Sequence, residues 1–184
     1  EYSCYNGYVS ADGTTWTKLD AQLVRSYGSY GRVDALGLKA GNYTLKVVPV
    51  KNGAEVTADA VTSSTLTVKN FNRSGYAHHN AEAGVGAYND DGTLKSGARV
   101  LYVTGNTAKT VTIDMKKDKG NSVSLTGLQS ILGAYEKGTE TRPLAIRIIG
   151  TIKKDDMDAL GSSAIGLQVK GKTQQMNLTI EGVG

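Results

Sequence analysis

Glycine recurs at short intervals along this chain and sets the strongest limit on its fold. There are 23 glycines and only 2 prolines among 184 residues, whereas glycine usually makes up about 7% of a protein. The stretches between them are short and rich in β-branched and aromatic residues, which favour strands. We therefore expect many short strands joined by tight turns. The hydrophobic content of 39% supports a packed core and excludes wholesale disorder.

The first part of the chain, residues 1–72, predicts a β-sandwich. Turn signals such as Asp12-Gly13 and Asn52-Gly53 tolerate the positive φ of tight hairpins. They recur at a spacing of roughly ten residues, which is typical of a sandwich. The strand-like runs between the turns are Tyr8–Val9, Leu23–Tyr27, Gly31–Leu36, Tyr43–Val50 and Thr65–Val68.

The segment Leu38–Val47 resembles the fibronectin type III signature, in which a Leu, a turn and a Tyr precede an alternating strand. Tyr43 matches the tyrosine corner of that fold, whose hydroxyl binds the backbone a few residues upstream. The resemblance implies that Trp16 is a core residue of an early strand, so we expect Trp16 and Tyr43 to be largely buried. The alternative is that Trp16 forms a sugar-stacking platform with Tyr27 and Tyr30.

A polar, turn-rich stretch at residues 70–80 marks the expected boundary between two parts. Adjacent histidines on a strand point to opposite faces, so we interpret His78 and His79 as linker residues rather than metal ligands. Five strands are expected beyond this stretch, and Gly150, Gly171 and Gly182 each close one. These strands are Val100–Thr104, Thr110–Met115, Leu144–Ile149, Ile165–Lys170 and Met176–Glu181.

One stretch of the second part has helical spacing. Apolar residues fall three or four positions apart, with Ser124 as a candidate cap and Gly138 as the end; they are Leu125, Leu128, Ile131, Leu132 and Tyr135. The other segments are short strands without hairpin dipeptides between them, which favours the coils of a parallel β-helix. Because a coil buries its face only against its neighbours, and the sequence ends just after a strand, we expect a longer parent protein.

Residues 141–152, which include Ile148-Ile149-Gly150-Thr151-Ile152, resemble the strand that opens the right-handed β-helix in polysaccharide lyase family one, the pectate and pectin lyases. Asn177–Gly184 is similar to the next family element, an apolar strand that ends Gly-x-Gly. Gly84–Lys95 and Val100–Thr104 resemble the segment that joins a fibronectin-like module to this β-helix in gut and rumen bacterial members. The resemblance implies an all-β chain: a fibronectin type III-like β-sandwich over 1–72, then a linker and the N-terminal coils of a right-handed parallel β-helix, with one short helix, over 73–184.

The activity implied by this resemblance is Ca²⁺-assisted β-elimination on polygalacturonate or pectin by the secreted parent enzyme. The catalytic and calcium-binding residues would lie on central coils beyond this chain, so no catalytic, cofactor or metal residue is assigned here, and this chain alone is expected to be inactive. Asp155, Asp156 and Asp158 lack the Gly and the terminal Glu of a Ca²⁺ loop, so we interpret them as a solvated connection. Asp90-Asp91-Gly92 is interpreted as a turn.

The remaining features bear on partners and location. The net charge of 21 − 17 = +4 suits a polyanion such as an acidic plant polysaccharide. Lys116–Lys119 predicts a solvated hairpin tip rather than a nucleic-acid site. Cys4 is the only cysteine, so it forms no internal disulfide, and we interpret it as a small buried or terminal thiol. No run of 18 apolar residues occurs, so no membrane span is expected. We expect a secreted or extracellular protein, bacterial cell surface included.

An alternative to the enzyme hypothesis is a non-catalytic module that binds pectin or another carbohydrate, or an adhesive module. Ten tyrosines, one tryptophan and the positive net charge would supply aromatic stacking and attraction to uronates.

Overall fold

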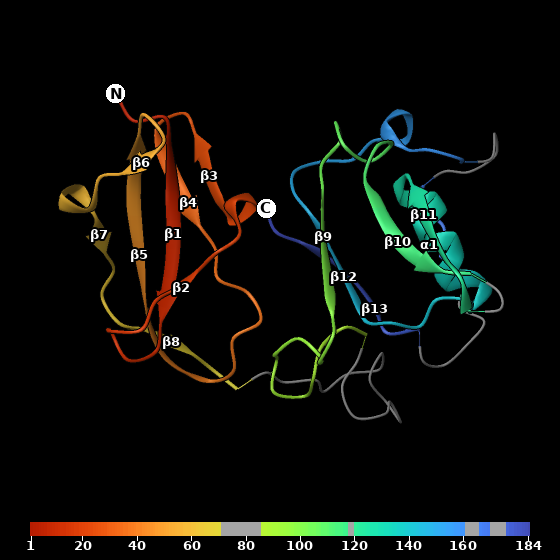
Figure 1. Ribbon diagram of the computed structural model, residues 1–184, viewed down its shortest axis with the longest axis horizontal. Helices are drawn as coiled ribbons and strands as arrows, with labels where there is room; N and C mark the ends of the chain where they lie inside the picture. Colours follow the sequence, from red (N-terminus) through yellow and green to blue (C-terminus); the bar gives the residue numbers. More distant parts are fainter. Residues whose placement is uncertain (71–85, 118–119, 161–165, 170–175) are drawn as a thin grey trace. The chain divides into compact units, whose positions relative to one another are not determined.

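The computed structural model describes residues 1–70, 86–117, 120–160, 166–169 and 176–184. These residues are mostly β-structure with one α-helix (Figure 1), which confirms the expected all-β class. The chain forms two compact units, Glu1–Ser74 with Asp90–Thr93, and Gly75–Asn89 with Leu94–Gly184. His78 and His79 lie outside the described residues, as does most of the expected linker.

The first unit is built on a six-stranded antiparallel sheet. Its central pair is β1 (Cys4–Ser10) and β5 (Gly41–Lys51), which are in register from Cys4 opposite Val50 to Ser10 opposite Thr44. The remaining strands are short: β2 (Thr17–Lys18) pairs with β1, whereas β6 (Ala54–Glu55), β7 (Val61–Thr62) and β8 (Leu66–Val68) pair with β5.

The Asn52-Gly53 turn joins β5 to β6 as the sequence predicts. Both residues have positive φ, 53° and 79°, the conformation of a type I′ hairpin turn. Glycine takes this conformation without strain and asparagine tolerates it, which explains this dipeptide at this position.

A hairpin of β3 (Val24–Tyr27) and β4 (Tyr30–Val33) packs against one face of this sheet. It is preceded by a 3₁₀ turn, η1 (Ala21–Leu23), whose Leu23 is buried. A methyl group at Gly7 of β1 would approach the side chains of Val24 and Val33 to 2.8 and 3.2 Å. Glycine at this position therefore lets the hairpin approach the sheet.

The tyrosine-corner bond is present, since the Tyr43 hydroxyl donates to the Lys39 carbonyl at 3.0 Å. The expected burial of Tyr43 and Trp16 is met only in part, because both residues have intermediate exposure and neither belongs to the buried core. The side chain of Lys46 lies over the Trp16 ring, with its Nζ 4.2 Å from the ring centroid.

The second unit contains a three-stranded parallel sheet in the order β13-β12-β9. Its strands are β9 (Arg99–Val103), β12 (Leu144–Ile148) and β13 (Leu178–Gly182), which correspond to three of the five expected strands. The register is even: Leu144 lies opposite Arg99 and Leu178, and Ile148 opposite Val103 and Gly182. Residues at the same step of the three strands therefore stack in rows.

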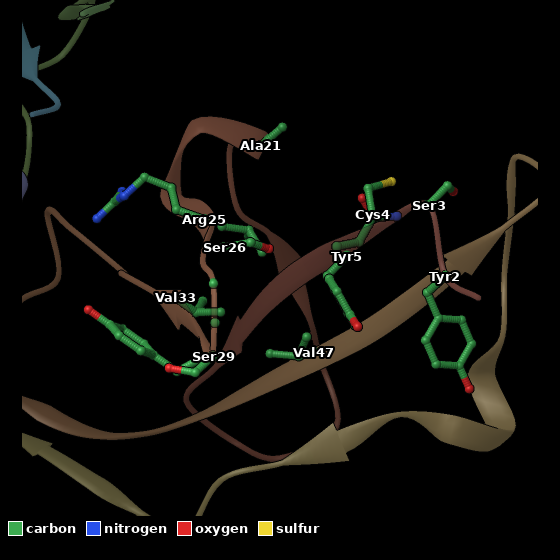
Figure 2. Close-up of a pocket in the computed structure, with 15 residues that line it drawn as sticks. Tyr2, Ser3, Cys4, Tyr5, Ala21, Arg25, Ser26, Ser29, Val33 and Val47 are labelled. Atoms are coloured by element: carbon green, nitrogen blue, oxygen red, sulfur yellow. The ribbon is translucent and has the colours of Figure 1, made fainter.

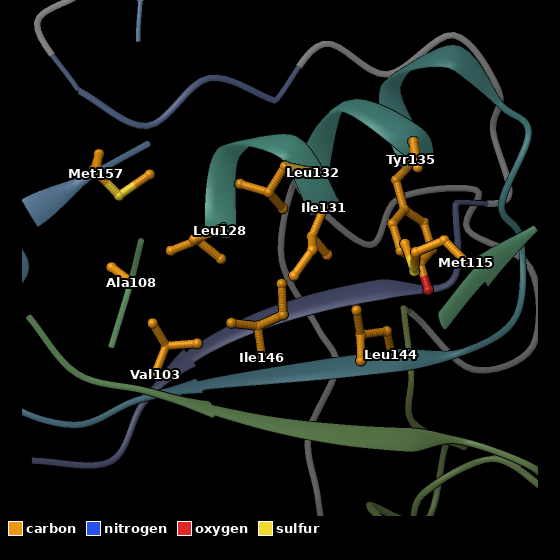
Figure 3. Packing of buried hydrophobic residues seen from close by; sticks show 11 residues of the cluster. Val103, Ala108, Met115, Leu128, Ile131, Leu132, Tyr135, Leu144, Ile146 and Met157 are labelled. Carbon is orange, nitrogen blue, oxygen red and sulfur yellow. The ribbon is translucent and has the colours of Figure 1, made fainter. Parts of the chain in front are cut away.

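Helix α1 (Leu128–Lys137) supplies most of the core beside this sheet (Figure 3). Its buried side chains repeat three or four positions apart, so one face of the helix is apolar. They contact buried side chains of β9 and β12. The fully buried members from the helix and these strands are Leu128, Ile131, Leu132, Tyr135, Val103, Leu144 and Ile146.

The ends of α1 correct one prediction and confirm another. Ser124 does not cap the helix, because it lies within β11 (Ser122–Thr126) and Gly127 occupies the N-cap position. Gly138 ends the helix in the left-handed conformation, with φ of 75°. The missed strand arises because Leu125 fits both a helical face and the alternation of a strand.

The β10–β11 hairpin agrees with the hairpin tip expected at Lys116–Lys119, although an antiparallel pair is not part of the coils expected for a parallel β-helix. β10 (Thr112–Lys116) pairs antiparallel with β11, with Thr112 opposite Thr126 and Lys116 opposite Ser122. Lys116 and Lys117 are exposed beside the turn, as expected, whereas Asp118 and Lys119 lie outside the described residues. Gly120 has φ of 79° and its N–H donates to the Lys117 carbonyl, which closes the turn without an Asn-Gly or Asp-Gly pair.

A strand is expected at Ile165–Lys170. In the described part of this segment, residues 166–169, the structure has no strand, so the prediction is wrong there. The backbone of Gln168 instead forms two hydrogen bonds with the side-chain amide of Gln129, at 2.8 and 3.0 Å. The side chain thus takes the place of a neighbouring strand. None of the described helices is long and apolar enough to cross a membrane.

Candidate functional site

The first unit has an open pocket of about 710 Å³ between the main sheet and the β3–β4 hairpin. Tyr5 of β1 and Val47 of β5 line it from the sheet, and Arg25 and Tyr30 line it from the hairpin. Tyr2 lies on the N-terminal segment at the rim, as Figure 2 shows. Val24 and Val33, the hairpin residues that lie close to Gly7 of the sheet, also line the pocket.

Three exposed tyrosines, Tyr2, Tyr5 and Tyr30, line this pocket, and Tyr27 stacks on one of them. Tyr27 and Tyr30 lie opposite each other across the hairpin and stack with ring centroids 5.4 Å apart. Tyr2 and Tyr5 meet edge to face at 6.1 Å. Tyr30 is 62% exposed and the other three are between 37% and 41% exposed. Clustered, exposed aromatic rings are typical of binding surfaces, since water-exposed rings gain from contact with a ligand.

Arg25 fixes the hairpin side of the site. Its guanidinium donates to Asp34 at 2.5 Å, to the Tyr27 hydroxyl at 3.0 Å and to the Gln22 carbonyl at 3.0 Å. Burial alone would lower the pKa of Arg25, but the hydrogen bonds with Tyr27 and Asp34 outweigh it and raise that pKa. The arginine thus stays charged and holds the Tyr27 ring in place.

The Tyr2 hydroxyl also has a carboxylate partner. It donates to Asp59 at 2.5 Å, and this hydrogen bond is the main reason that the pKa of Tyr2 is raised. The bond orients the Tyr2 ring at the rim of the pocket. Cys4 lies exposed along the same wall, near the N-terminus, which agrees with its interpretation as a terminal thiol.

The structure brings together only part of the predicted stacking platform. Tyr27 and Tyr30 form a pair as expected, but Trp16 lies instead near Lys46, which also lies 5.2 Å from the ring centroid of Tyr8. Sequence reasoning missed Tyr2 and Tyr5. Their only signal in the sequence is that they precede the first strand-like run. Their position beside the β3–β4 hairpin depends on a tertiary contact, which the spacing of residues in the sequence does not reveal.

Two of the three aspartates weighed as calcium ligands, Asp156 and Asp158, accept hydrogen bonds from backbone N–H groups. Asp158 accepts from the backbone N–H groups of Gln129 and Ser130 at 2.8 and 3.0 Å, and from the Ser130 hydroxyl at 2.6 Å. Asp156 accepts from the N–H of Lys153 at 2.7 Å. The interpretation as a solvated connection holds for exposed Asp155 and is wrong for Asp158, which caps the N-terminus of α1.

These carboxylates do not fit a calcium ion, because the oxygens of Asp156 and Asp158 face N–H and O–H donors rather than one another. Across the described ranges, no group of three or more His, Cys, Asp or Glu side chains is placed to hold a metal ion. The Asp90-Asp91-Gly92 turn is confirmed: Asp91 accepts from the N–H and hydroxyl of Thr93 at 3.0 and 2.6 Å.

A buried ion pair lies in the second unit, on the parallel sheet. Arg147 of β12 is 4% exposed and lies in one row with Tyr102 of β9 and Glu181 of β13. Its nitrogens donate to Glu181 at 2.9 Å, to the Tyr102 hydroxyl at 2.8 Å and to the Tyr88 hydroxyl at 3.1 Å. Burial opposes the charge, but these bonds raise the pKa of Arg147 overall. Since each guanidinium nitrogen has a protein partner, we interpret this cluster as structural.

Comparison with known proteins finds no family model, no curated protein and no solved structure that matches this chain. The likeness to polysaccharide lyase family one therefore rests on the sequence motifs, and function has to be argued from the molecule itself.

Proposed function

We propose that this chain is the N-terminal portion of a secreted pectate-lyase-like enzyme that cleaves polygalacturonate or pectin by Ca²⁺-assisted β-elimination. The observation that carries the proposal is the in-register parallel stack of β9, β12 and β13. A parallel β-helix is built by such stacking of one strand per coil. The central strand of the stack leads directly into Gly150-Thr151-Ile152, the motif that resembles the family.

The first unit fits the same proposal as a fibronectin type III-like module that precedes the β-helix. Its support is the hydrogen bond from the Tyr43 hydroxyl to the Lys39 carbonyl, the bond expected of a tyrosine corner. The layered arrangement of the main sheet and the β3–β4 hairpin also suits a sandwich.

No step of the elimination is assigned to residues of this chain. The described carboxylates do not fit calcium, and the catalytic residues of such an enzyme would lie on further coils. What this chain can do is bind and orient an acidic polysaccharide. A second candidate function is therefore a non-catalytic carbohydrate-binding or adhesive module, carried by the tyrosine-rimmed pocket of the first unit.

The lyase proposal is tested with polygalacturonate and Ca²⁺, by following the ultraviolet absorbance of the unsaturated product. We expect no product from the 184-residue chain and clear product from a longer protein that continues past Gly184. A gene that does not continue with β-helix coils carrying several aspartates and a basic residue would remove the lyase proposal.

The binding candidate is tested by affinity electrophoresis in gels that contain polygalacturonate, with Tyr30→Ala. Tyr30 is the most exposed ring at the pocket, so its loss should weaken binding about three- to tenfold without unfolding the protein. Val61→Ala is the matched control, because Val61 is 70% exposed and lies outside the pocket. Unretarded migration of the unaltered chain at low salt would exclude the binding role.

A further inference from the structure

A second pocket, which the preceding proposals do not use, lies in the second unit between the β10–β11 hairpin and α1. Its volume is about 420 Å³. Three lysines line it: Lys116 and Lys117 come from the hairpin end, and Lys137 comes from the last turn of the helix. Val123 and Leu125 of β11 form an apolar wall.

Among the described residues that line this pocket, every charged side chain is positive. All three lysines are exposed, and none has an ion-pair partner within the part of the chain that the structure describes. No aspartate or glutamate is among the described residues that line the pocket. Three uncompensated ammonium groups around one concavity raise the local positive potential and attract an anion. The chain as a whole carries a net charge of only +4.

Gly133 provides an independent observation. It lies in the middle of α1 with an ordinary helical conformation, and a methyl group built on it would meet no atom within 4 Å. Neither the backbone nor packing therefore requires glycine here, although glycine destabilises a helix interior by about 1 kcal/mol relative to alanine. Because Gly133 has no side chain, open space remains where α1 lines the pocket.

The lining also narrows the chemistry of the ligand. Val123 and Leu125 are half-buried, on the same face of β11, and offer an apolar surface to the C–H groups of a sugar ring. No aromatic side chain lines the pocket among the described residues, so it lacks the stacking platform that single-stranded nucleic acids require. An anionic sugar matches both the cations and the apolar wall.

We propose that this pocket binds a uronate residue of an acidic oligosaccharide, with Lys116, Lys117 and Lys137 facing its carboxylate. The site is non-catalytic and would hold the polysaccharide on the second unit. The identity of the ligand as a uronate rests on the proposed function, whereas the anion-binding character rests on the pocket itself.

The test measures binding of a defined oligogalacturonide to the 184-residue chain by calorimetry, at low salt and with a chelator present. We expect Lys116→Gln/Lys117→Gln/Lys137→Gln to weaken binding roughly tenfold, since each exposed charge pair contributes modestly. Lys51→Gln/Lys69→Gln/Lys109→Gln is the matched control, because it lowers the net charge equally, from +4 to +1, at exposed lysines outside the pocket. The control should bind like the unaltered chain.

A steric variant tests the same pocket without changing charge. Gly133→Leu should fill the open space and weaken binding to a similar extent. Leucine favours a helix more than glycine does, so the thermal unfolding temperature should not fall. Loss of binding with an unchanged or higher unfolding temperature separates blockage of the pocket from misfolding.

Two ligand controls define the chemistry. The fully methyl-esterified oligosaccharide, which has no carboxylates, should not bind. A single-stranded oligonucleotide of equal charge should compete poorly with the oligogalacturonide. If it competes equally well, the pocket is part of a general polyanion-binding surface and is not a uronate site.

The outcomes separate this inference from the proposed function. If both lysine variants bind alike while Tyr30→Ala loses affinity, the pocket is not a uronate site, yet the carbohydrate-binding role of the first unit stands. If the unaltered chain does not bind the oligogalacturonide, the inference fails, whereas the lyase proposal is still decided by product formation in the longer protein.

Discussion

The Glu140 side chain has no exposed surface, yet it carries a negative charge. Several hydrogen-bond donors around the carboxylate stabilise this charge. The backbone N–H groups of Lys116 and Arg142 donate to it at 2.8 Å, and the Arg142 guanidinium donates at 2.7 and 3.0 Å. Burial alone would raise the pKa of Glu140, but these hydrogen bonds lower it to about 2. The carboxylate thus ties the end of β10 to the connection between α1 and β12.

This pKa predicts how stability depends on pH. The pKa of Glu140 is about 2 in the folded protein and 4.5 in its ordinary state. The stabilisation is therefore fully present above pH 4.5 and is lost as the pH falls towards 2, by about 3 kcal/mol in total. Chemical denaturation between pH 6 and pH 2 measures this change.

Glu140→Gln should reduce stability at pH 6 and flatten that acid dependence. The control is Glu136→Gln, since Glu136 has no ion-pair partner among the residues described, and it should leave the pH profile unchanged. An identical profile for Glu140→Gln would show that the buried carboxylate is not the group that titrates.

Tyr43→Phe tests the tyrosine corner. Removal of the hydroxyl leaves the Lys39 carbonyl without this donor. Because Tyr43 is only half-buried, water replaces part of the lost bond, so we expect a loss of about 1 kcal/mol. Thermal unfolding measures it, with Tyr30→Phe as the control at a 62% exposed ring. Equal unfolding temperatures for the two variants would remove the assigned role of the hydroxyl.

Helix α1 takes its N-terminal cap from a remote loop. Gly127, with φ of 96°, precedes the helix and brings no capping side chain of its own. Asp158 supplies the acceptor for the N–H groups of Gln129 and Ser130. A methyl group at Gly127 would lie 2.2 Å from the Asp158 carboxyl group, so the glycine is needed for this approach. The cap couples the helix start to the loop after β12.

Asp158→Asn should destabilise the second unit by about 1 kcal/mol, because it removes the charge at the helix N-terminus and weakens the cap. Circular dichroism during urea unfolding measures the change. Asp155→Asn is the matched control, since Asp155 is exposed in the same loop. A larger effect at Asp155 than at Asp158 would contradict the capping assignment.

Strands with a clear apolar pattern over several residues were predictable from the sequence. The strands with which they pair were not. The runs that became β5 and β13 alternate over several residues, the runs that became β9 and β12 are almost continuously apolar, and all four positions agree within a few residues. The two-residue strands β2, β6 and β7 were missed because so short a run has no periodicity. Ile165–Lys170 alternates equally well, yet its described part bonds to Gln129 rather than to a strand.

The same limit applies to the sites. The Tyr27–Tyr30 pair was predictable because a tight turn joins the two residues, whereas Tyr2, Tyr5 and the Asp158 cap depend on contacts between segments far apart in the chain. The lysines of the second pocket were visible as a charged run only at Lys116 and Lys117. Lys137 joins them because the hairpin folds beside the last turn of α1.

At the scale of the whole molecule, each unit buries its own apolar residues. In the first unit these include Val9, Leu23, Val48 and Val50. In the second unit one cluster joins α1, β9, β10 and β12 (Figure 3). A unit with its own core can unfold as a cooperative block of its own.

We therefore expect two transitions in calorimetric unfolding of the chain, each sensitive to a different core. Ile146→Val removes one buried methyl group and should lower only the transition of the second unit, by about 5 °C. Val48→Ala should lower only the transition of the first unit, since Val48 is 2% exposed in its sheet. Each variant is the control for the other. A single transition that both variants shift by a similar amount would mean that the two units unfold together, and the division into separately stable blocks would be wrong.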